Sequence, residues 1–375
     1  LGSGFANDAW GYTSPRGYKF AIIGGFFETL FVDITDPRNP VVSPNAGISG
    51  SPSSWRDFKT YGQYAYSVTE GGGGMHVIDL SQLEPPTRTA QLVGIFNELG
   101  FDSAHTVTLN PDSGFLYLNG SNLGGGRLIA VDLANPANPQ IAGQALDASY
   151  VHDSQVVTYT TGPYAGREIA FCHDGGNGLH ILDVTNKSNM FLLSTLSYPT
   201  RSYTHQGWLT TDRRYLIFDD ELEELNGLVS NTTVYVADVQ NLTSPFLAAT
   251  FTHPTGCWID HDLHVRGNRV YQAQYSHGMS VLDISNPFAP TEVAYFDTHP
   301  EDNSQDFVGM WGSFAGFPTR VVVGSDMERG LFVLCDEPEK PLAGFVLDKP
   351  SASCEELITF DAASSTHCTP ARSLV

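Results

Sequence analysis

Positive charge is scarce in this sequence. The chain has 41 Asp and Glu against 19 Lys and Arg, a formal net charge of -22. A surface of this sign repels the phosphate backbone of nucleic acids, so we expect no nucleic-acid partner. The acidity suits cations or basic partners, and it also serves simply to keep a protein soluble.

Long apolar runs and common catalytic signatures are missing as well. No uninterrupted stretch of about 18 apolar residues occurs, so we expect no transmembrane segment in these residues. Neither Gly-x-Ser-x-Gly nor His-Glu-x-x-His is present, which leaves serine hydrolases and the common zinc proteases without support. The glycine runs at 71–74 and 124–126 precede no Lys-Ser/Thr pair, so they indicate turns rather than phosphate cradles.

Cysteine is sparse and unevenly placed. The five cysteines are Cys172, Cys257, Cys335, Cys354 and Cys368, and the last three lie within the C-terminal 41 residues. We expect a disulfide between Cys354 and Cys368, because a local bond would stabilise a tail with little core of its own. An odd number leaves one cysteine unpaired or bonded to another chain.

Four N-glycosylation sequons favour an extracellular protein, secreted or held at the cell surface. They begin at Asn119, Asn186, Asn231 and Asn241. Glycans require exposed acceptors, and most of these asparagines fall in or beside expected turns. Polar turns also produce such triplets by chance.

Short strands and turns recur throughout the chain. The run GMSVLDISNPFAP (278–290) alternates in character and ends in an Asn/Pro turn, which is typical of a strand leaving a sheet. Related runs centre on Asp33, Asp79, Asp132, Asp183, Asp238, Asp283 and, at the seventh place, Cys335. The intervals of 46, 53, 51, 55, 45 and 52 residues suit one four-stranded propeller blade each.

The sequence therefore predicts an all-β fold. We expect a seven-bladed β-propeller over residues 1–336 and a short, irregular C-terminal tail over 337–375. The 22 Phe, 16 Tyr and 5 Trp supply bulky side chains to pack between twisted sheets. Because a ring must close, we expect the first blade to share its sheet with strand material from the far end of the propeller.

Histidines recur at one place in successive blades. His105, His152, His205 and His261 stand at or just before the first strand of four blades, and Asp153 and Asp262 directly follow two of them. First strands line the central channel, so these imidazoles are predicted to converge on the axis. Such ligands suit a divalent transition metal: zinc, manganese, iron, nickel or copper.

A second set of polar residues ends the second strand of several blades. In an up-and-down blade this end lies at the same edge as the start of the first strand. We expect His173 and His277 to be further metal ligands. The carboxylates of the set should line the pocket or orient ligands: Glu70, Asp174, Asp219, Asp220 and Asp326.

A simpler interpretation exists for each histidine taken singly. An imidazole at a strand start often donates to a neighbouring carbonyl, and a His-Asp pair can tie one blade to the next. Four histidines in equivalent places favour the metal site over this alternative.

The ordered motifs resemble those of a known family. LFVDITDPRNP (30–40), THQGW (204–208), DHDLHV (260–265) and MSVLDISNPFAP (279–290) are similar to motifs of the LVIVD-repeat proteins called the choice-of-anchor B family. The resemblance covers roughly residues 7–335. It implies an extracellular β-propeller attached to surfaces by varied C-terminal devices, a family without a well-defined biochemical activity.

Two functions from different classes remain. The first is an interaction module that binds proteins or glycans, or assembles with copies of itself, and holds the ion structurally. The second is an extracellular metal-dependent hydrolase or oxidoreductase, with Asp153, Asp219 or Asp262 as the base. The missing catalytic signature favours the first, whereas an open coordination position beside a pocket would favour the second.

Overall fold

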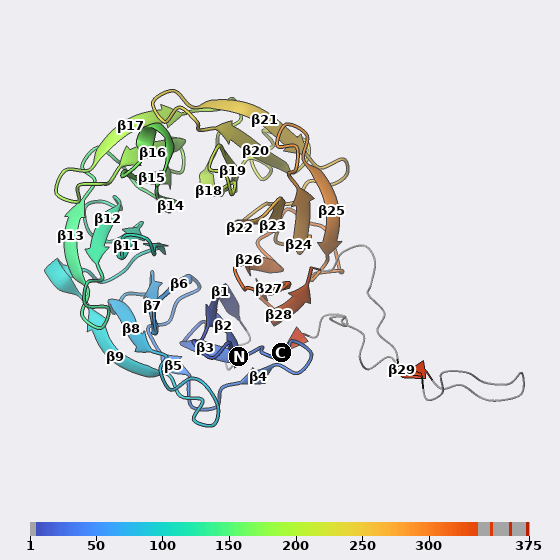
Figure 1. Ribbon diagram of the computed structural model, residues 1–375. Coiled ribbons are helices and arrows are strands. Elements are labelled where there is room, and N and C mark those ends of the chain that lie inside the picture. The colour runs from blue at the N-terminus through green and yellow to red at the C-terminus, as the bar shows by residue number, and fades with distance from the viewer. Residues whose placement is uncertain (1–4, 337–345, 348–359, 362–372, 375) are drawn as a thin grey trace, which may run out of the picture.

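Seven β-sheets stand around a central axis, as predicted (Figure 1). The computed structural model describes residues 5–336 and the two-residue strands at 346–347, 360–361 and 373–374. Helix in this part of the chain is limited to the 3-10 turns η1 (Glu98–Gly100) and η2 (Gly162–Tyr164). None of its helices is long and apolar enough to pass through a bilayer.

Each blade is an antiparallel sheet whose strands run outward in chain order. From blade one to blade seven the first strands are β1 (Ala6–Thr13), β6 (Arg56–Tyr61), β10 (Thr106–Asn110), β14 (Asp153–Thr158), β18 (Thr204–Leu209), β22 (Leu263–Arg266) and β26 (Met310–Phe314). The second strands are β2 (Lys19–Gly25), β7 (Tyr64–Thr69), β11 (Phe115–Asn119), β15 (Glu168–His173), β19 (Tyr215–Asp220), β23 (Arg269–Ala273) and β27 (Val321–Asp326).

The outer half of each blade follows the same order. The third strands are β3 (Glu28–Asp33), β8 (Met75–Asp79), β12 (Ile129–Asp132), β16 (Leu179–Asp183), β20 (Thr233–Asp238), β24 (Met279–Asp283) and β28 (Gly330–Cys335). The outermost are β4 (Val41–Val42), β9 (Gln91–Phe96), β13 (Gln140–Gln144), β17 (Phe191–Leu196), β21 (Phe246–Thr252), β25 (Thr291–Phe296) and β31 (Ser373–Leu374). Strand β5 (Ile48–Ser49) also pairs with β3, and β29 (Val346–Leu347) pairs with β30 (Phe360–Asp361).

The recurring acid of the repeat ends the third strand and caps the turn behind it. In six blades this carboxylate accepts a hydrogen bond of 2.7 to 3.0 Å from the backbone N–H two residues on. These residues are Asp33, Asp79, Asp132, Asp183, Asp238 and Asp283. The repeat signature is therefore a turn-forming device, since Asp side chains bond readily to nearby backbone.

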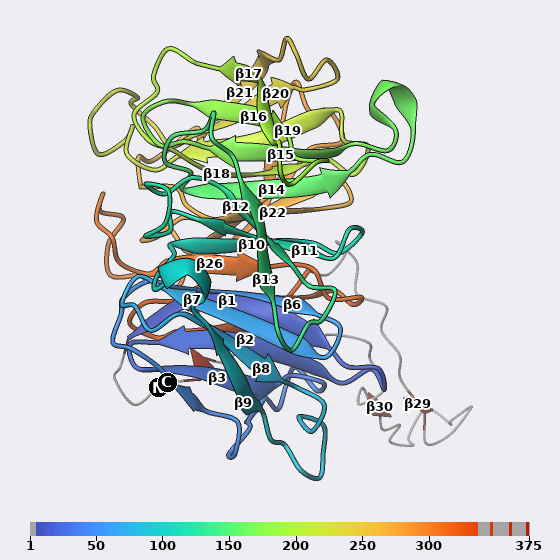
Figure 2. The ribbon, with the colours of Figure 1, turned by 90° about the vertical axis from the view of Figure 1, so that its left-hand side faces the viewer.

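The hydrophobic core is divided among the seven interfaces between neighbouring blades. Each interface has its own cluster of buried side chains; between blades two and three, for example, Tyr66 and Met75 pack with Leu118 and Val131. Because no blade buries both faces alone, stability depends on the complete ring. In the side view the inner strands β10 and β14 run along the axis (Figure 2), so their first residues gather at one end of the channel.

The ring closes by packing between blades seven and one. Phe317 and Val323 pack against Ala9 and Ile23, and the backbone N–H of Ala6 donates to the carbonyl of Met327 at 3.0 Å. The expectation that blade one shares its sheet with a strand from the far end was wrong. The distant strand, β31, joins the outer edge of blade seven instead, where Leu331 pairs with Leu374.

The predicted disulfide and the predicted glycosylation sites have different outcomes in the structure. The expected Cys354–Cys368 disulfide lies outside the described residues, whereas Cys172 and Cys257 are free thiols. Asn119 is fully buried and its amide donates to Thr106 and Thr108, so its sequon is closed to a glycan in the folded protein. Asn186 and Asn241 are exposed, and the half-buried Asn231 donates to the carbonyl of His253.

Candidate metal centre

The four histidines that recur in the sequence lie side by side at one end of the channel. Ring centroids are 4.2 Å apart for His105 and His152, 4.4 Å for His152 and His205, and 4.2 Å for His205 and His261. They come from the edges of the inner strands of blades three to six. Because the first strands of neighbouring blades begin at the same end of the channel, the four imidazoles lie in one row.

Each of these imidazoles is held through Nδ1. His152 donates to the carbonyl of His205 at 3.0 Å, and His261 donates to the carbonyl of Trp311 at 2.6 Å. The Nδ1 of His205 lies 3.2 Å from an oxygen of Asp219, and that of His105 lies 2.7 Å from an oxygen of Glu70. His152 and His261 have carbonyl partners, so their proton is on Nδ1 and Nε2 presents a lone pair, the arrangement typical of metal-binding histidines.

Burial favours the neutral form of three of these imidazoles. It lowers the pKa of His152 and of His205 well below the usual range, helped by the neighbouring imidazoles. Burial also lowers the pKa of His261, against the opposing effect of Glu221. Neutral imidazole is the form that binds a metal ion.

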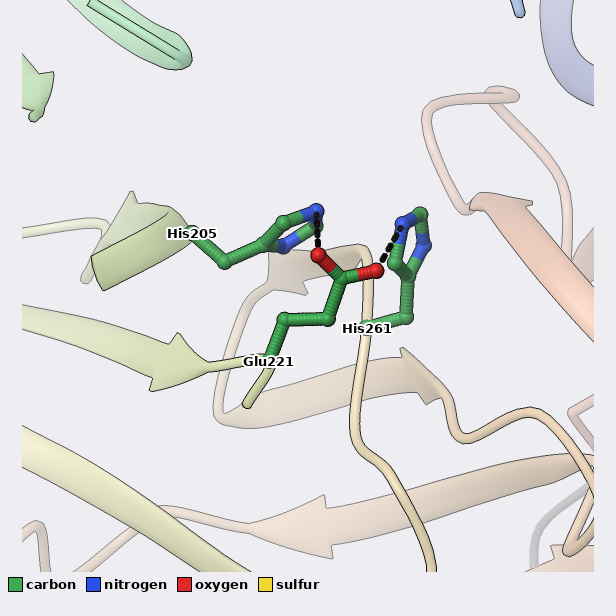
Figure 3. Close-up of side chains that lie close together, drawn as sticks. All are labelled: His205, Glu221 and His261. Atoms are coloured by element: carbon green, nitrogen blue, oxygen red, sulfur yellow. Dashed lines mark ion pairs between the residues drawn. The ribbon is translucent and has the colours of Figure 1, made fainter. Parts of the chain in front are cut away.

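A carboxylate that the sequence prediction missed completes the group. Glu221, one residue beyond β19, places its two carboxylate oxygens between two imidazoles, 3.9 Å from Nε2 of His205 and 3.6 Å from Nε2 of His261 (Figure 3). One ligand atom from each of these three residues lies within 4.8 Å of the others. The signal in the sequence was the acidic run from Asp219 to Glu221, of which only the first two residues fell on the predicted strand end.

These distances are longer than direct hydrogen bonds and are compatible with an ion bound among the three side chains. Gaps of 3.6 and 3.9 Å are too long for N–H···O bonds. In a tetrahedral site with bonds of about 2.1 Å, nitrogen and oxygen ligands lie about 3.4 Å apart. Two imidazole nitrogens and one carboxylate are a donor set for zinc or another transition metal, and they fit the group that the sequence predicts.

A cavity of about 880 Å³ occupies the channel beside this group. All four histidines line it, and Trp55, Lys59 and Asp153 line it as well. Three protein ligands leave at least one position of a four-coordinate ion open, as in catalytic rather than structural zinc sites. The arrangement can therefore present a metal ion to a small molecule in the channel.

Two predicted histidine ligands lie apart from Glu221. His173 is fully buried, its Nδ1 donates to the carbonyl of Asp153 at 3.3 Å, and burial lowers its pKa to about 3. His277 stacks on Trp258 with centroids 3.7 Å apart and contacts Tyr295 on the outermost strand of blade six. His277 therefore faces the rim of its blade and not the axis.

The two predicted aspartate ligands have other partners. Asp262 accepts hydrogen bonds from the backbone N–H and hydroxyl of Ser313 and lies 3.4 Å from His264, so it ties blade six to blade seven. Asp153 lines the cavity, and burial raises its pKa to about 7 although Lys59 opposes the shift. It stays a candidate acid or base in the channel rather than a ligand.

The predicted pocket carboxylates divide into two kinds. Glu70 and Asp219 orient His105 and His205, as described above. The other three cap backbone turns or hold neighbouring side chains: Asp220 accepts from Tyr198, Asp174 lies 3.0 Å from His180, and Asp326 accepts from the N–H groups of Glu328 and Arg329. Among the described residues only His205, Glu221 and His261 form a compact group of metal-binding side chains.

Known proteins support the repeat and the fold. Residues 169–198 and 261–298 match the LVIVD repeat family. Both segments carry a third strand with its Asp-capped turn, and the second begins at His261. No curated protein matches the chain in sequence.

Several solved structures share the architecture. The β-propeller domain of Cps50 (Swd1) from Myceliophteria thermophila has a TM-score of 0.59 at 12% identity, over 89% of this chain and 98% of that chain. A protein from Lactobacillus plantarum has a TM-score of 0.59 at 11% identity, over 82% and 88%. Hydrazine synthase from Kuenenia stuttgartiensis has a TM-score of 0.57 at 11% identity, over 89% and 96%. At these identities the likeness concerns the fold alone.

Proposed function

We propose that this β-propeller binds one divalent transition-metal ion through His205, Glu221 and His261, and that the ion binds and activates a small ligand in the central cavity. The observation that carries this proposal is the position of Glu221, whose two carboxylate oxygens each face Nε2 of one imidazole at 3.6 and 3.9 Å. Nε2 of His261 has no proton to give Glu221, because its Nδ1 donates to the carbonyl of Trp311, and a cation removes the repulsion between this lone pair and the carboxylate.

The open coordination position favours the metal-dependent enzyme over a purely structural ion. A bound transition metal supplies Lewis-acid activation of water or of a ligand oxygen. The chain's own residues would orient the ion through Asp219 and Trp311, which fix the two imidazoles. The channel walls would exclude bulk solvent from the bound ligand.

The test is metal analysis of protein purified without chelator. We expect one transition-metal ion per chain, lost in the double variant His205→Ala/His261→Ala and retained in His299→Ala, which changes a histidine outside the group. Cobalt-substituted protein should also change its visible spectrum when azide is added, because azide would occupy the open position. Equal metal content in the double variant and the wild type would rule out the site.

A propeller with LVIVD repeats also fits an interaction module, and one observation favours this second function. The outer strand β9 exposes Leu92, Val93 and Ile95, and large apolar residues are exposed on the outer strands of other blades too. Exposed apolar side chains on a sheet edge can contact a partner. A pull-down that compares the wild type with Leu92→Lys/Ile95→Lys tests this function, and we expect the variant to lose partner proteins. Capture of the same proteins by both would show that this surface binds no partner.

We further propose that the protein works outside the cytoplasm, as the choice-of-anchor B resemblance implies. The support is the exposure of Asn186 and Asn241 in turns behind third strands. Cell fractionation of the host organism, with detection of this chain in the extracellular or surface fraction, is the direct measurement.

A further inference from the structure

Tyr275 has a backbone conformation that tyrosine rarely adopts. It lies in the turn between β23 and β24 with φ +37, where the Gln274 N–H donates to the carbonyl of Gly278 at 2.7 Å. A bulky side chain with positive φ is strained, because its Cβ crowds the backbone. Such strain persists where the surrounding structure enforces it, and it gathers at functional sites.

Blade four shows how this turn is made without strain. Its equivalent residue is Gly175, with φ +45, which bridges to Thr204 of the next blade just as Tyr275 bridges to Met310. Glycine adopts positive φ without a steric penalty. The tyrosine of blade six is therefore not required by the backbone of the turn.

The side chain of Tyr275 reaches the proposed metal centre. Its hydroxyl donates to Oε1 of Glu221 at 2.8 Å, and its ring contacts the imidazole of His261 with centroids 4.9 Å apart. The same Oε1 faces Nε2 of His261, while Oε2 faces Nε2 of His205. The hydrogen bond thus sets the rotation of the carboxylate, so that each oxygen points to one imidazole.

We infer that Tyr275 is a positioning residue of the proposed metal centre, holding Glu221 in the orientation that binds the ion. The inference rests on the proposed function. A tyrosine that only fills the core also tends to bond its hydroxyl, and the Tyr275 ring packs on Phe307 as well as on His261. The positioning role therefore rests on the hydroxyl bond to Glu221. Hydrogen-bond partners of metal ligands commonly affect metal affinity about 10- to 100-fold.

The experiment compares Tyr275→Phe with the wild type and with Tyr117→Phe. The control removes another buried tyrosine hydroxyl, which donates to the carboxylate of Glu168 at 2.6 Å. Neither Tyr117 nor Glu168 belongs to the group of His205, Glu221 and His261. Zinc affinity is measured by competition with a chromophoric chelator, and the visible spectrum is recorded after loading with cobalt. Thermal melting without metal shows whether each variant is folded.

We expect Tyr275→Phe to bind zinc about 10- to 100-fold more weakly and to shift the cobalt spectrum, with both properties unchanged in Tyr117→Phe. Tyr275→Gly should lose affinity similarly, although it relieves the backbone. Wild-type affinity and spectrum in Tyr275→Phe would overturn the positioning role and leave the metal centre standing. Equal losses in both Phe variants would assign the effect to general destabilisation, and a wild type that binds no zinc or cobalt would remove the proposed function and this inference together.

Discussion

The side-chain amide of Gln206 forms two hydrogen bonds with the backbone of Leu263. Its oxygen accepts from the Leu263 N–H and its nitrogen donates to the Leu263 carbonyl, both at 3.0 Å. Inner strands of neighbouring blades belong to separate sheets, so here a side chain takes the place of a backbone ladder. Asp57 with the N–H of Val107 joins blades two and three by a similar device.

This contact predicts a loss of stability in Gln206→Ala. The residue is buried, and its removal leaves the N–H and carbonyl of Leu263 without those partners, a cost of about 1–3 kcal/mol for each unpaired buried group. Chemical denaturation should show a lower midpoint than for Gln91→Ala, a change at an exposed residue of β9. Matching midpoints for the two variants would mean that the amide does not hold the blades together.

Removal of the metal should destabilise the wild type. A ligand that binds only the folded chain adds about 2.7 kcal/mol at a concentration of 100 times its Kd. We expect a chelator to lower the melting temperature of wild-type protein. His205→Ala/His261→Ala should melt at the same temperature with and without chelator, and a chelator effect of wild-type size in this variant would contradict the site.

Acid should destabilise the metal-free protein partly through His173. Its folded pKa is about 3 because of burial, whereas an unfolded histidine titrates near 6.5. Below about pH 6.5 His173 binds a proton in the unfolded chain but stays neutral in the folded chain. The free energy of unfolding therefore falls by up to about 1.4 kcal/mol for each pH unit. His173→Asn keeps a donor near Nδ1 but cannot titrate. Its free energy of unfolding should fall less steeply between pH 6.5 and 4.5, and parallel curves would refute the assignment.

Glu224 should act in the opposite direction. Burial and the neighbouring Glu223 raise its pKa to about 9, so the folded chain keeps a proton that the unfolded chain loses above about pH 4.5. Stability from this residue is present below pH 4.5 and is lost as the pH rises toward 9. Glu224→Gln should therefore be more stable than the wild type at pH 8 and similar at pH 4.5. A destabilised variant at pH 8 would show that the ionised carboxylate has a favourable partner.

Glycosylation should follow exposure rather than the presence of a sequon. When the chain is secreted from a eukaryotic host, we expect glycans at Asn186 and Asn241 and none at Asn119, which is fully buried in blade three. Enzymatic deglycosylation in oxygen-18 water converts each glycosylated asparagine to a labelled aspartate, which peptide mass spectrometry then detects site by site. A glycan at Asn119 on folded protein would contradict the placement of its amide.

The sequence by itself determined the seven blades and the row of imidazoles. The repeat carries its own turn chemistry, in which residues such as Asp183 cap the end of the third strand, and equivalent strand starts must share one end of the channel. The sequence alone therefore predicts that His105, His152, His205 and His261 lie together.

Tertiary structure decided which neighbours these imidazoles meet. Glu221 and Tyr275 lie beyond strand ends, in turns whose paths no repeat period fixes, so the sequence could not place them at the axis. Asp262 follows His261 as Asp153 follows His152, yet it bonds to Ser313 of the next blade, and His277 lies in a turn where it stacks on Trp258. Strand spacing is a local property, whereas the direction of a side chain depends on packing between blades that are distant in the chain.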